Sequence, residues 1–329
     1  MPNVAIVGAT GAVGQEFLKI LKERNFPVEE LRLLATKRSA GKKIDWQGRT
    51  LEVQETTAGS FKGVDIALFA GGSASTEYAQ AAVADGAVVI DNSSAFRMDP
   101  EVPLVVPEVN PEDVAWHKGI IANPNCSTII MVVALKPILD TAGIKRVVVS
   151  TYQAVSGAGR EGIEELEAQV AAWTKGEALK AQVFPYQIAF NLIPRIDVFA
   201  EGDYTKEEWK MVKETRKIFH RPDMAITATT VRVPVLRSHS ESVNVETERH
   251  VSVEAARAAL AKAAGVVVID DPAQDKYPMP WYSADQDQVF VGRLRQDFSC
   301  ENGLNMWVVG DQIRKGAATN AVQIAELLL

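Results

Sequence analysis

The chain has 329 residues, of which 47% are hydrophobic and 23% are charged, and its formal net charge is −7. This composition is typical of a globular protein, and at about 150 residues per domain the length predicts two domains. The acidic balance argues against a general nucleic-acid or membrane surface, since such surfaces need clustered Lys and Arg. It leaves open a local cationic pocket for a small anion.

The two cysteines cannot build a disulfide framework, and no C-x-x-C pair offers a zinc site, so we expect no metal. No apolar run reaches the roughly 18 residues that a membrane span needs. The first predicted strand begins within a few residues of Met1 and leaves no room for a signal peptide. A cytoplasmic location is therefore expected, with no membrane partner.

Short apolar runs alternate with helical patterns over residues 1–125. Strands are predicted at 3–7, 31–36, and from residues 64, 87 and 104, with helices after the first glycine turn and over 74–84. The apolar stripe of the first helix has the spacing i, i+4, i+7, i+8, at Val13, Phe17, Ile20 and Leu21. Strands buried on both faces with intervening helices predict an α/β fold with a mostly parallel, doubly wound sheet.

The pattern changes after Ile144, where strands and helices no longer alternate regularly. Strands are predicted at 147–152, between 226 and 246 and at 304–311, and helices at 160–173, 205–219, 253–264 and 317–329. This arrangement is typical of an α+β domain with a large sheet. We place the domain boundary at residues 125/126. The first domain is completed by the segment from about 309 to 329, and the second covers 126–308.

A glycine-rich turn, GATGAVG at 8–14, joins the first strand to the first helix. Glycines permit a tight turn and let backbone N–H groups approach a pyrophosphate at the helix N-terminus. The spacing G-x-x-G-x-x-G is one residue wider than the usual dinucleotide fingerprint, and a plain strand–helix turn is the alternative. Its context favours a nucleotide site.

The loop after the second strand reads TKRSAG, at 36–41, where an NAD-selective fold would place Asp or Glu. A cationic loop with hydroxyl groups suits a 2′-phosphate, so NADP is the favoured cofactor. The alternative is a solvated basic turn.

Cys126 follows a predicted strand end at Ala122 and a turn at Pro124, and a helix is predicted to start near it. A thiol at a helix N-terminus feels the positive end of the macrodipole, which lowers a thiol pKa and favours the nucleophilic thiolate. The alternative, a buried structural cysteine, fits Cys300 in DFSCENG, which has no such setting.

Six motifs in this order resemble the aspartate-β-semialdehyde dehydrogenase family over essentially the full length: GATGAVG (8–14), DNSSAFR (91–97), NPNCST (123–128), TYQAVSGAG (151–159), ETRK (214–217) and VRVPVLRSHS (231–240). The resemblance implies a Rossmann-like NADP-binding domain and an α+β catalytic and dimerisation domain with a large mixed sheet. It implies a homodimer, with a tetramer left open.

The implied reaction is NADPH-dependent reduction of aspartyl-β-phosphate to aspartate semialdehyde and phosphate. The product would feed lysine (through diaminopimelate), threonine, methionine and isoleucine synthesis. By the same resemblance Cys126 is the nucleophile that carries a thioester and His239 is the acid–base residue. Gln153 lies near the nucleophile and donates a hydrogen bond to substrate.

The resemblance also implies the residues that hold the substrate. Arg97 and Lys217 would bind the phosphate, Arg232 the α-carboxylate and Glu214 the ammonium group, and arginine offers the planar fork that suits such anions. Glu214 and Lys217 are three residues apart on a predicted helix, and an ordinary surface ion pair is the alternative.

The resemblance implies cofactor contacts at Asn92, Gln312 and Asn320. Other contacts are expected at the glycine turn, the basic loop, the strand end before Gly72 and the turn after Gln153. Together these residues are Gly8, Thr10, Gly11, Ala12, Val13, Arg38, Ser39, Gly72, Ser73, Asn92, Ser156, Gly157, Gln312 and Asn320. Ser73 and Ser75 could instead cap the following helix.

Two rival functions stay open at this point. Other acyl-phosphate reductases, such as N-acetyl-glutamyl-phosphate reductase and phosphorylating glyceraldehyde dehydrogenase, share the nucleotide domain, the cysteine and the histidine. An acetylated amine has no use for Glu214 as an ammonium partner. A non-catalytic NADP-binding paralogue would need none of Cys126, Gln153, Arg232 and His239, and the chain has all four.

Overall fold

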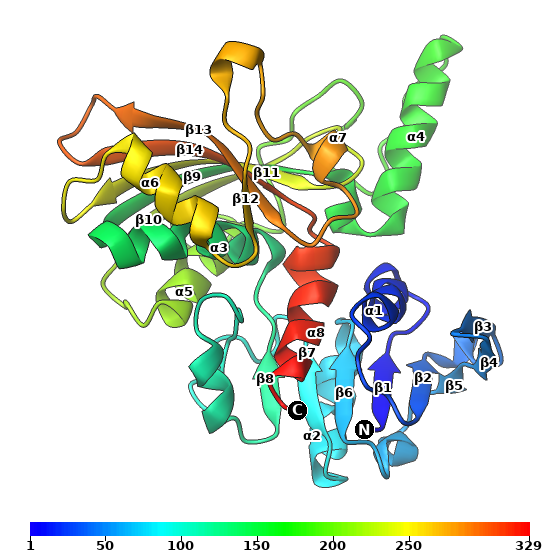
Figure 1. Cartoon of the computed structure of the whole chain (residues 1–329). Coiled ribbons are helices and arrows are strands. Elements are labelled where there is room, and N and C mark those ends of the chain that lie inside the picture. The colour runs from blue at the N-terminus through cyan, green and yellow to red at the C-terminus, as the bar shows by residue number, and fades with distance from the viewer. The chain divides into compact units, whose positions relative to one another are not determined.

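The computed structural model of the chain (Figure 1) describes all residues, 1–329, and they form two compact units. Unit 1 comprises Met1–Asn125, Lys217–Phe219 and Gly316–Leu329, and unit 2 comprises Cys126–Arg216 and His220–Lys315. None of the helices combines the length and the apolar character needed to cross a bilayer.

Unit 1 is built on sheet A, whose six strands follow the order β5-β2-β1-β6-β7-β8 and pair in parallel throughout. Its strands are β1 (Val4–Val7), β2 (Leu31–Ala35), β5 (Gln54–Glu55), β6 (Ile66–Phe69), β7 (Val88–Asp91) and β8 (Ile120–Ala122). The strand order reverses next to β1, as in doubly wound nucleotide-binding folds. The predicted Rossmann-like fold is confirmed.

Helices α1 (Ala12–Glu23) and α8 (Thr319–Glu326) pack together on one face of sheet A, at the red and dark-blue ends of the chain in Figure 1. Their apolar stripes meet Ile6 and Leu68 of the strands, and all these side chains are buried. Alternate strand residues face the other side, where Phe69 stacks on Phe61 at 5.8 Å between ring centroids. Helix α2 (Ser73–Ala84) packs against β6 and β7.

Unit 2 is built on a mixed sheet, sheet C, with the order β10-β9-β11-β14-β13-β12. Its strands are β9 (Ile144–Gln153), β10 (Ala225–Arg232), β11 (His239–Thr247), β12 (Val266–Val268), β13 (Val289–Asp297) and β14 (Gly303–Gly310). The pairs β9–β10 and β12–β13 are parallel and the other three are antiparallel. This confirms the predicted α+β domain with a large mixed sheet.

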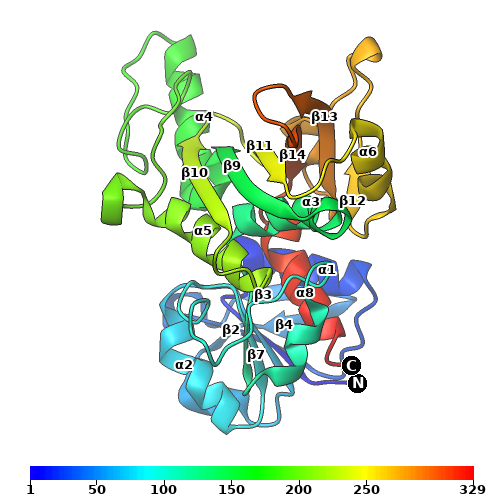
Figure 2. The ribbon, with the colours of Figure 1, turned by 90° about the vertical axis from the view of Figure 1, so that its left-hand side faces the viewer.

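Helices α3 (Cys126–Ala142) and α6 (Val253–Lys262) lie side by side against sheet C (Figure 2). Helix α3 is almost entirely apolar after its first turn, as expected of a helix buried against a sheet. The other helices that begin in unit 2 are α4 (Arg160–Thr174), α5 (Lys206–Ile218) and α7 (Pro280–Ser283).

The strand predicted from Leu104 is wrong. Leu104 makes one isolated bridge to Ala122, and the chain then folds into a turn around the side chain of Asn110. The Asn110 amide donates to the Leu104 carbonyl and accepts from the Val106 N–H. These local bonds replace a strand ladder.

Two further differences concern short elements. The hairpin of β3 (Lys43–Trp46) and β4 (Arg49–Glu52) was not predicted; its strands have four residues each and no buried residue. The C-terminal helix, predicted over 317–329, is a π-helical turn at Arg314–Ala318 followed by α8.

Candidate active site

Three predicted catalytic and substrate-binding residues lie in one row at the end of sheet C. Arg232 of β10 pairs directly with Gln153 of β9. In the β9–β11 register Ser240 pairs with Tyr152, which places His239 beside Gln153. Arg232, Gln153 and His239 are all buried, at 6%, 2% and 0% exposure. The sheet therefore assembles a cation, an amide and an imidazole from strands that are distant in sequence.

Cys126 is the first residue of α3, where the sequence reading expected a helix to start. Its side chain is half-buried. Burial lowers the pKa of Arg232, and the charges of Glu207 and of the Cys126 thiolate act in the opposite direction. The charges of the Arg232 guanidinium and the Cys126 thiolate therefore attract each other.

The backbone of Ala154 joins His239 to Arg232. The Ala154 N–H donates to His239 Nδ1 at 3.1 Å, and Arg232 Nη1 donates to the Ala154 carbonyl at 2.6 Å. Because Nδ1 accepts a hydrogen bond, the neutral ring carries its proton on Nε2. Burial and the Arg232 charge hold the pKa of His239 well below its ordinary value. His239 is therefore a neutral imidazole that presents an Nε2–H donor.

The amide of Gln153 is oriented by two residues that sequence reasoning missed. The Thr151 hydroxyl donates to Gln153 Oε1 at 3.0 Å, and Gln153 Nε2 donates to Glu207 Oε1 at 3.2 Å. Gln153 Nε2 also lies 3.4 Å from His239 Nε2, a contact between two donors in this tautomer. No sequence signal links Glu207 to Gln153, 54 positions away.

Gly157 allows the segment after Gln153 to approach the row. A Cβ at this position would lie 2.7 Å from Arg232 Nη1 and 3.1 Å from His239 Cε1. Any side chain larger than hydrogen would displace one of these groups. The short helical turn Val155–Ala158, called η4 below, thus covers the imidazole and the guanidinium.

The glycine turn of unit 1 has the shape of a nucleotide cradle. Gly8 adopts φ 84°, Gly11 precedes α1 without any side-chain cap, and Ala12 and Val13 form the first turn of the helix. A Cβ at Gly14 would lie 2.2 Å from the Gly8 carbonyl oxygen, so only glycine permits this packing. The helix N-terminus is left to satisfy its N–H groups with an anion or water.

The basic loop lies next to this turn within unit 1. Thr10 Oγ1 donates to Ser39 Oγ at 3.2 Å, which ties the turn to the loop, and Arg38 is exposed. These residues fit a dinucleotide with a phosphorylated ribose, since they combine helix N–H groups, hydroxyls and a cation.

Two further expected cofactor positions begin α2. Gly72 precedes the helix with φ 82°, Ser73 is the first helical residue, and no side chain caps the helix. Ser75 does not cap α2 either, because its buried hydroxyl donates to Asp91 Oδ1 at 2.5 Å.

Asn92 and Asn320 are linked through Asn123. Asn320 Nδ2 donates to Asn123 Oδ1 at 2.7 Å, and Asn123 Nδ2 donates to Asn92 Oδ1 at 2.8 Å. Asn320 is fully buried, and its amide nitrogen also donates to the Val105 carbonyl. The chain of amides fixes the segment that precedes Asn125 and ends unit 1.

Arg97 and Lys217 are brought together within unit 1. Arg97 is 7% exposed and its Nη2 donates to the Asn92 carbonyl. Lys217 Nζ donates to the carbonyls of Arg97, Asp99 and Val102 at 2.7–2.8 Å. A phosphate that binds Lys217 would have to replace one of these bonds. Glu214, one helical turn before it, is 1% exposed.

Two remaining expected cofactor residues, Ser156 and Gln312, lie in unit 2 and are buried. The side-chain amide of Gln312 donates to the Ser156 hydroxyl. No group of three or more His, Cys, Asp or Glu side chains is placed to hold a metal ion.

Two family models match the chain. The model described as the semialdehyde dehydrogenase NAD binding domain matches residues 3–117, and the semialdehyde dehydrogenase dimerisation domain matches residues 135–315. Among proteins, an aspartate-semialdehyde dehydrogenase of Aquifex aeolicus is 63% identical over 99% of this chain and 98% of its own length. A Bacillus subtilis protein of the same name is 54% identical over 99% and 97%.

Solved structures agree with these sequence matches. Aspartate semialdehyde dehydrogenase II from Vibrio cholerae, solved in complex with ASA, superposes with a TM-score of 0.97 at 51% identity, over 100% of this chain and 98% of that one. The enzyme from Candida albicans, solved with NADP, superposes with a TM-score of 0.76 at 27% identity, over 100% and 98%.

Proposed function

The chain belongs to the aspartate-semialdehyde dehydrogenase family, and we propose that it reduces L-aspartyl-4-phosphate to L-aspartate-4-semialdehyde and phosphate with NADPH. The observation that carries this proposal is the cluster in unit 2, where Cys126 is coupled to Arg232 and His239 is held neutral beside Gln153. The product would supply lysine (through diaminopimelate), threonine, methionine and isoleucine synthesis.

Acylation is the task of Cys126. Its thiolate attacks the acyl-phosphate carbonyl, the S–C bond forms, and the C–O bond to phosphate breaks. The result is a thioester on Cys126. The position at the start of α3 and the Arg232 charge both favour ionisation of the thiol.

Stabilisation of the oxyanion is the task of His239. NADPH, when bound, supplies the hydride that reduces the thioester. The carbonyl oxygen becomes an oxyanion in both the acylation and the reduction, and the Nε2–H of a neutral imidazole can donate to it in each. The oxyanion then re-forms the C=O bond and expels the Cys126 thiolate, which restores the nucleophile.

Four charged residues would recognise the substrate. Arg232 suits the α-carboxylate, because its guanidinium presents a fork from a buried position in the row. Glu214 suits the ammonium group. Arg97 suits the phosphate, and Lys217 holds the carbonyls of the Arg97 segment and is a second phosphate candidate.

NADP rather than NAD is the proposed cofactor. Arg38, with the Thr10–Ser39 hydroxyl pair beside it, would bind the 2′-phosphate. Gly8, Gly11, Ala12 and Val13 would bind the pyrophosphate at the start of α1, with Gly72, Ser73 and Asn92 nearby along sheet A. Residues 1–125, completed by about 309–329, would form the NADP-binding domain, and residues 126–308 the catalytic and dimerisation domain.

The deciding experiment measures phosphate-dependent reduction of NADP⁺ at 340 nm with aspartate semialdehyde, N-acetyl-glutamate semialdehyde and glyceraldehyde 3-phosphate. Turnover with aspartate semialdehyde alone is expected. A preference for either other aldehyde would assign the chain to another acyl-phosphate reductase activity. Cofactor binding without turnover of any aldehyde would identify a non-catalytic paralogue.

Cofactor choice is tested on the same assay with NADP⁺ and NAD⁺, for the native chain and Arg38→Ala. The native chain is expected to prefer NADP⁺, and the variant to lose most of that preference through a higher KM for NADP⁺. A native preference for NAD⁺ would contradict the proposed role of the basic loop.

A further inference from the structure

Ser238, the residue immediately before His239, has a backbone conformation that needs support. It adopts φ 72°, in the left-handed region that L-residues with a side chain occupy at an energetic cost. Ser238 is fully buried. Its N–H donates to the side-chain Oε1 of Gln312 at 2.9 Å. Gln312 therefore holds the chain in the conformation from which His239 enters β11.

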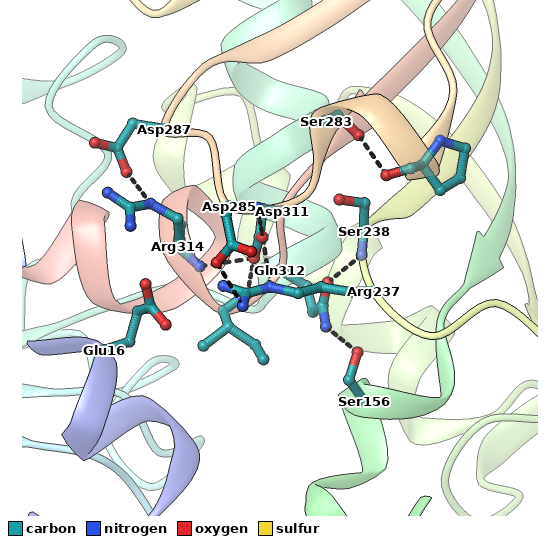
Figure 3. A network of polar contacts seen from close by, with 12 residues as sticks. Glu16, Ser156, Arg237, Ser238, Ser283, Asp285, Asp287, Asp311, Gln312 and Arg314 are labelled. Carbon is teal, nitrogen blue, oxygen red and sulfur yellow. Dashed lines mark hydrogen bonds and ion pairs between the residues drawn. The ribbon is translucent and has the colours of Figure 1, made fainter. Parts of the chain in front are cut away.

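The other end of the same amide reaches the turn that covers His239. Gln312 Nε2 donates to the Ser156 hydroxyl in η4, and Gln312 itself is 4% exposed. Figure 3 shows the amide between Ser156 on one side and Ser238 on the other. A Cβ on Gly157, the next residue of η4, would lie 3.2 Å from His239 Nε2. One side chain thus bridges the two segments that enclose the imidazole.

Gln312 is itself fixed by the fully buried carboxylate of Asp311 (Figure 3). Asp311 Oδ2 accepts from Arg237 Nε at 2.6 Å and from the Asp285 N–H at 2.7 Å. Asp311 Oδ1 accepts from the N–H groups of Ile313 and Arg314. Four donors compensate the buried charge, and they anchor the segment after β14 to Arg237, which precedes Ser238.

We propose that Gln312 is a positioning residue: it holds the imidazole donor of His239 under η4. The Arg237–Asp311 pair in turn holds Gln312 in place. This inference rests on the proposed function. It gives Gln312 a role distinct from direct contact with the cofactor. A side chain that contacts only the cofactor would change cofactor affinity and leave the orientation of His239 intact.

Gln312→Met removes both amide hydrogen bonds and keeps a similar side-chain volume. The expected result is a fall of about 10–100-fold in kcat for aspartate semialdehyde oxidation, since small misplacement of a catalytic group costs rates of that order. The dissociation constant of NADPH, measured by its fluorescence, is expected to change less than about threefold. A higher dissociation constant with unchanged kcat would overturn the proposal.

The pH dependence of kcat/KM gives a second readout. His239 faces Arg232 of β10, and Arg232 in turn interacts with Glu207 of α5 and Cys126 of α3. Loss of the Gln312 bridge loosens η4 and admits water to the ring, which weakens the burial that lowers the pKa of His239. The acid limb of the profile should therefore move to higher pH in Gln312→Met. An unmoved acid limb would contradict a role through His239.

Two further variants separate positioning from a general loss of stability. Gln296→Met is the matched control, because it removes a glutamine amide that donates within sheet C, to the Gly303 carbonyl. This variant should keep native kcat. Ser156→Ala removes the hydroxyl that Gln312 bonds, so its effect on kcat should be smaller in the Gln312→Met background than in the native chain. If the double variant loses kcat by the product of the two single losses, Gln312 and Ser156 act independently and the proposed bridge is wrong.

Arg237→Gln tests the anchor without touching Gln312, and a smaller fall in kcat than for Gln312→Met is expected. Native kcat in Arg237→Gln would show that the Arg237–Asp311 pair is not needed to hold Gln312 in place. Failure of the native chain to oxidise aspartate semialdehyde at all would instead refute the proposed function, independently of these comparisons.

Discussion

The regions around the two cysteines place the same side chain in opposite electrostatic surroundings. Both thiols are half-buried and neither forms a disulfide. Cys126 begins α3 and interacts with the Arg232 guanidinium. Cys300 lies in the turn between β13 and β14 with its Sγ 3.7 Å from Asp297 Oδ2. Burial and the charge of Asp297 raise the pKa of the Cys300 thiol. Exposure alone therefore does not distinguish the two thiols, whereas the charges that act on them do.

Substitution of each cysteine in turn should give the largest difference in kcat between the two regions. Cys126→Ala is expected to reduce kcat by at least about 10³-fold, since the covalent route is lost. Cys300→Ala should stay within about twofold, because burial and the charges of Asp297 and Glu246 raise the pKa of its thiol. The phosphate-dependent assay measures both. Comparable losses of kcat in the two variants would contradict the assignment of Cys126, and not Cys300, as the nucleophile.

His239→Asn tests whether the imidazole stabilises the oxyanion without being needed to activate the Cys126 thiol. A fall of about 10²–10³-fold in kcat is expected, in the range usual for loss of one oxyanion donor. Alkylation of Cys126 by iodoacetamide should continue at a similar rate, because Arg232 remains. Loss of both kcat and the alkylation rate of Cys126 would show that His239 is needed to activate the thiol.

The pH dependence of the native enzyme follows from the lowered pKa of His239. The ring stays neutral as pH falls through the ordinary histidine range near 6.5, so protonation of His239 should not reduce kcat/KM there. The same shift affects the free energy of unfolding. As pH falls, His239 takes up a proton in the unfolded chain before it does so in the folded chain. The stability that the lowered pKa provides is therefore complete above about pH 6.5 and is lost as pH falls below that value. A kcat/KM limb with an ordinary histidine pKa that disappears in His239→Asn would contradict the neutral ring.

Arg232→Gln should weaken the cation beside Cys126. Iodoacetamide is expected to alkylate Cys126 about 3–10-fold more slowly at neutral pH, since one favourable charge partner of the thiolate is lost. Alkylation of Cys300 serves as the internal control and should not change. The KM for aspartate semialdehyde should also rise if Arg232 binds the carboxylate. An unchanged Cys126 rate would show that the helix N-terminus alone activates it.

Asp297→Asn should have the smallest effect and the opposite direction. Hydrogen bonds from Ser299 and Asn244 lower the pKa of Asp297 to about 2, so it is ionised at all working pH values. Removal of its charge should lower the pKa of Cys300 and speed alkylation there by about two- to threefold, while Cys126 is unaffected. A slower Cys300 reaction would contradict the assigned cause.

The sequence predicted the local features of the site well. Cys126 was predicted at the start of a helix from the preceding strand, the turn at Pro124 and the hydroxyl residues that follow, and it begins α3. The glycine turn was predicted from its spacing, and it precedes α1. Both features depend on residues within a few positions of one another. The parallel, doubly wound character of sheet A likewise follows from the alternation of strands and helices.

Contacts between distant segments were not predictable from patterns. Glu207 of α5 accepts from Gln153 of β9, and Gln312, which follows β14, donates to Ser156 of η4. One sequence does not show which of these elements meet in space. The apolar run after Leu104 was mistaken for a strand because its buried valines hide the turn around Asn110. An apolar run indicates that a segment is buried, but hydrogen bonds from a side chain such as Asn110 decide whether the segment forms a strand or a turn.

The most direct test of the central claim, that Cys126 carries the acyl group, omits phosphate from the reaction. The enzyme is mixed with aspartate semialdehyde and NADP⁺, the burst of NADPH is recorded, and the acid-quenched protein is mapped by peptide mass spectrometry. The account predicts a burst of one NADPH per active site and one aspartyl group on the Cys126 peptide, with Cys300 unmodified. NADPH formation without an acylated Cys126, or acylation of Cys300 instead, would contradict it.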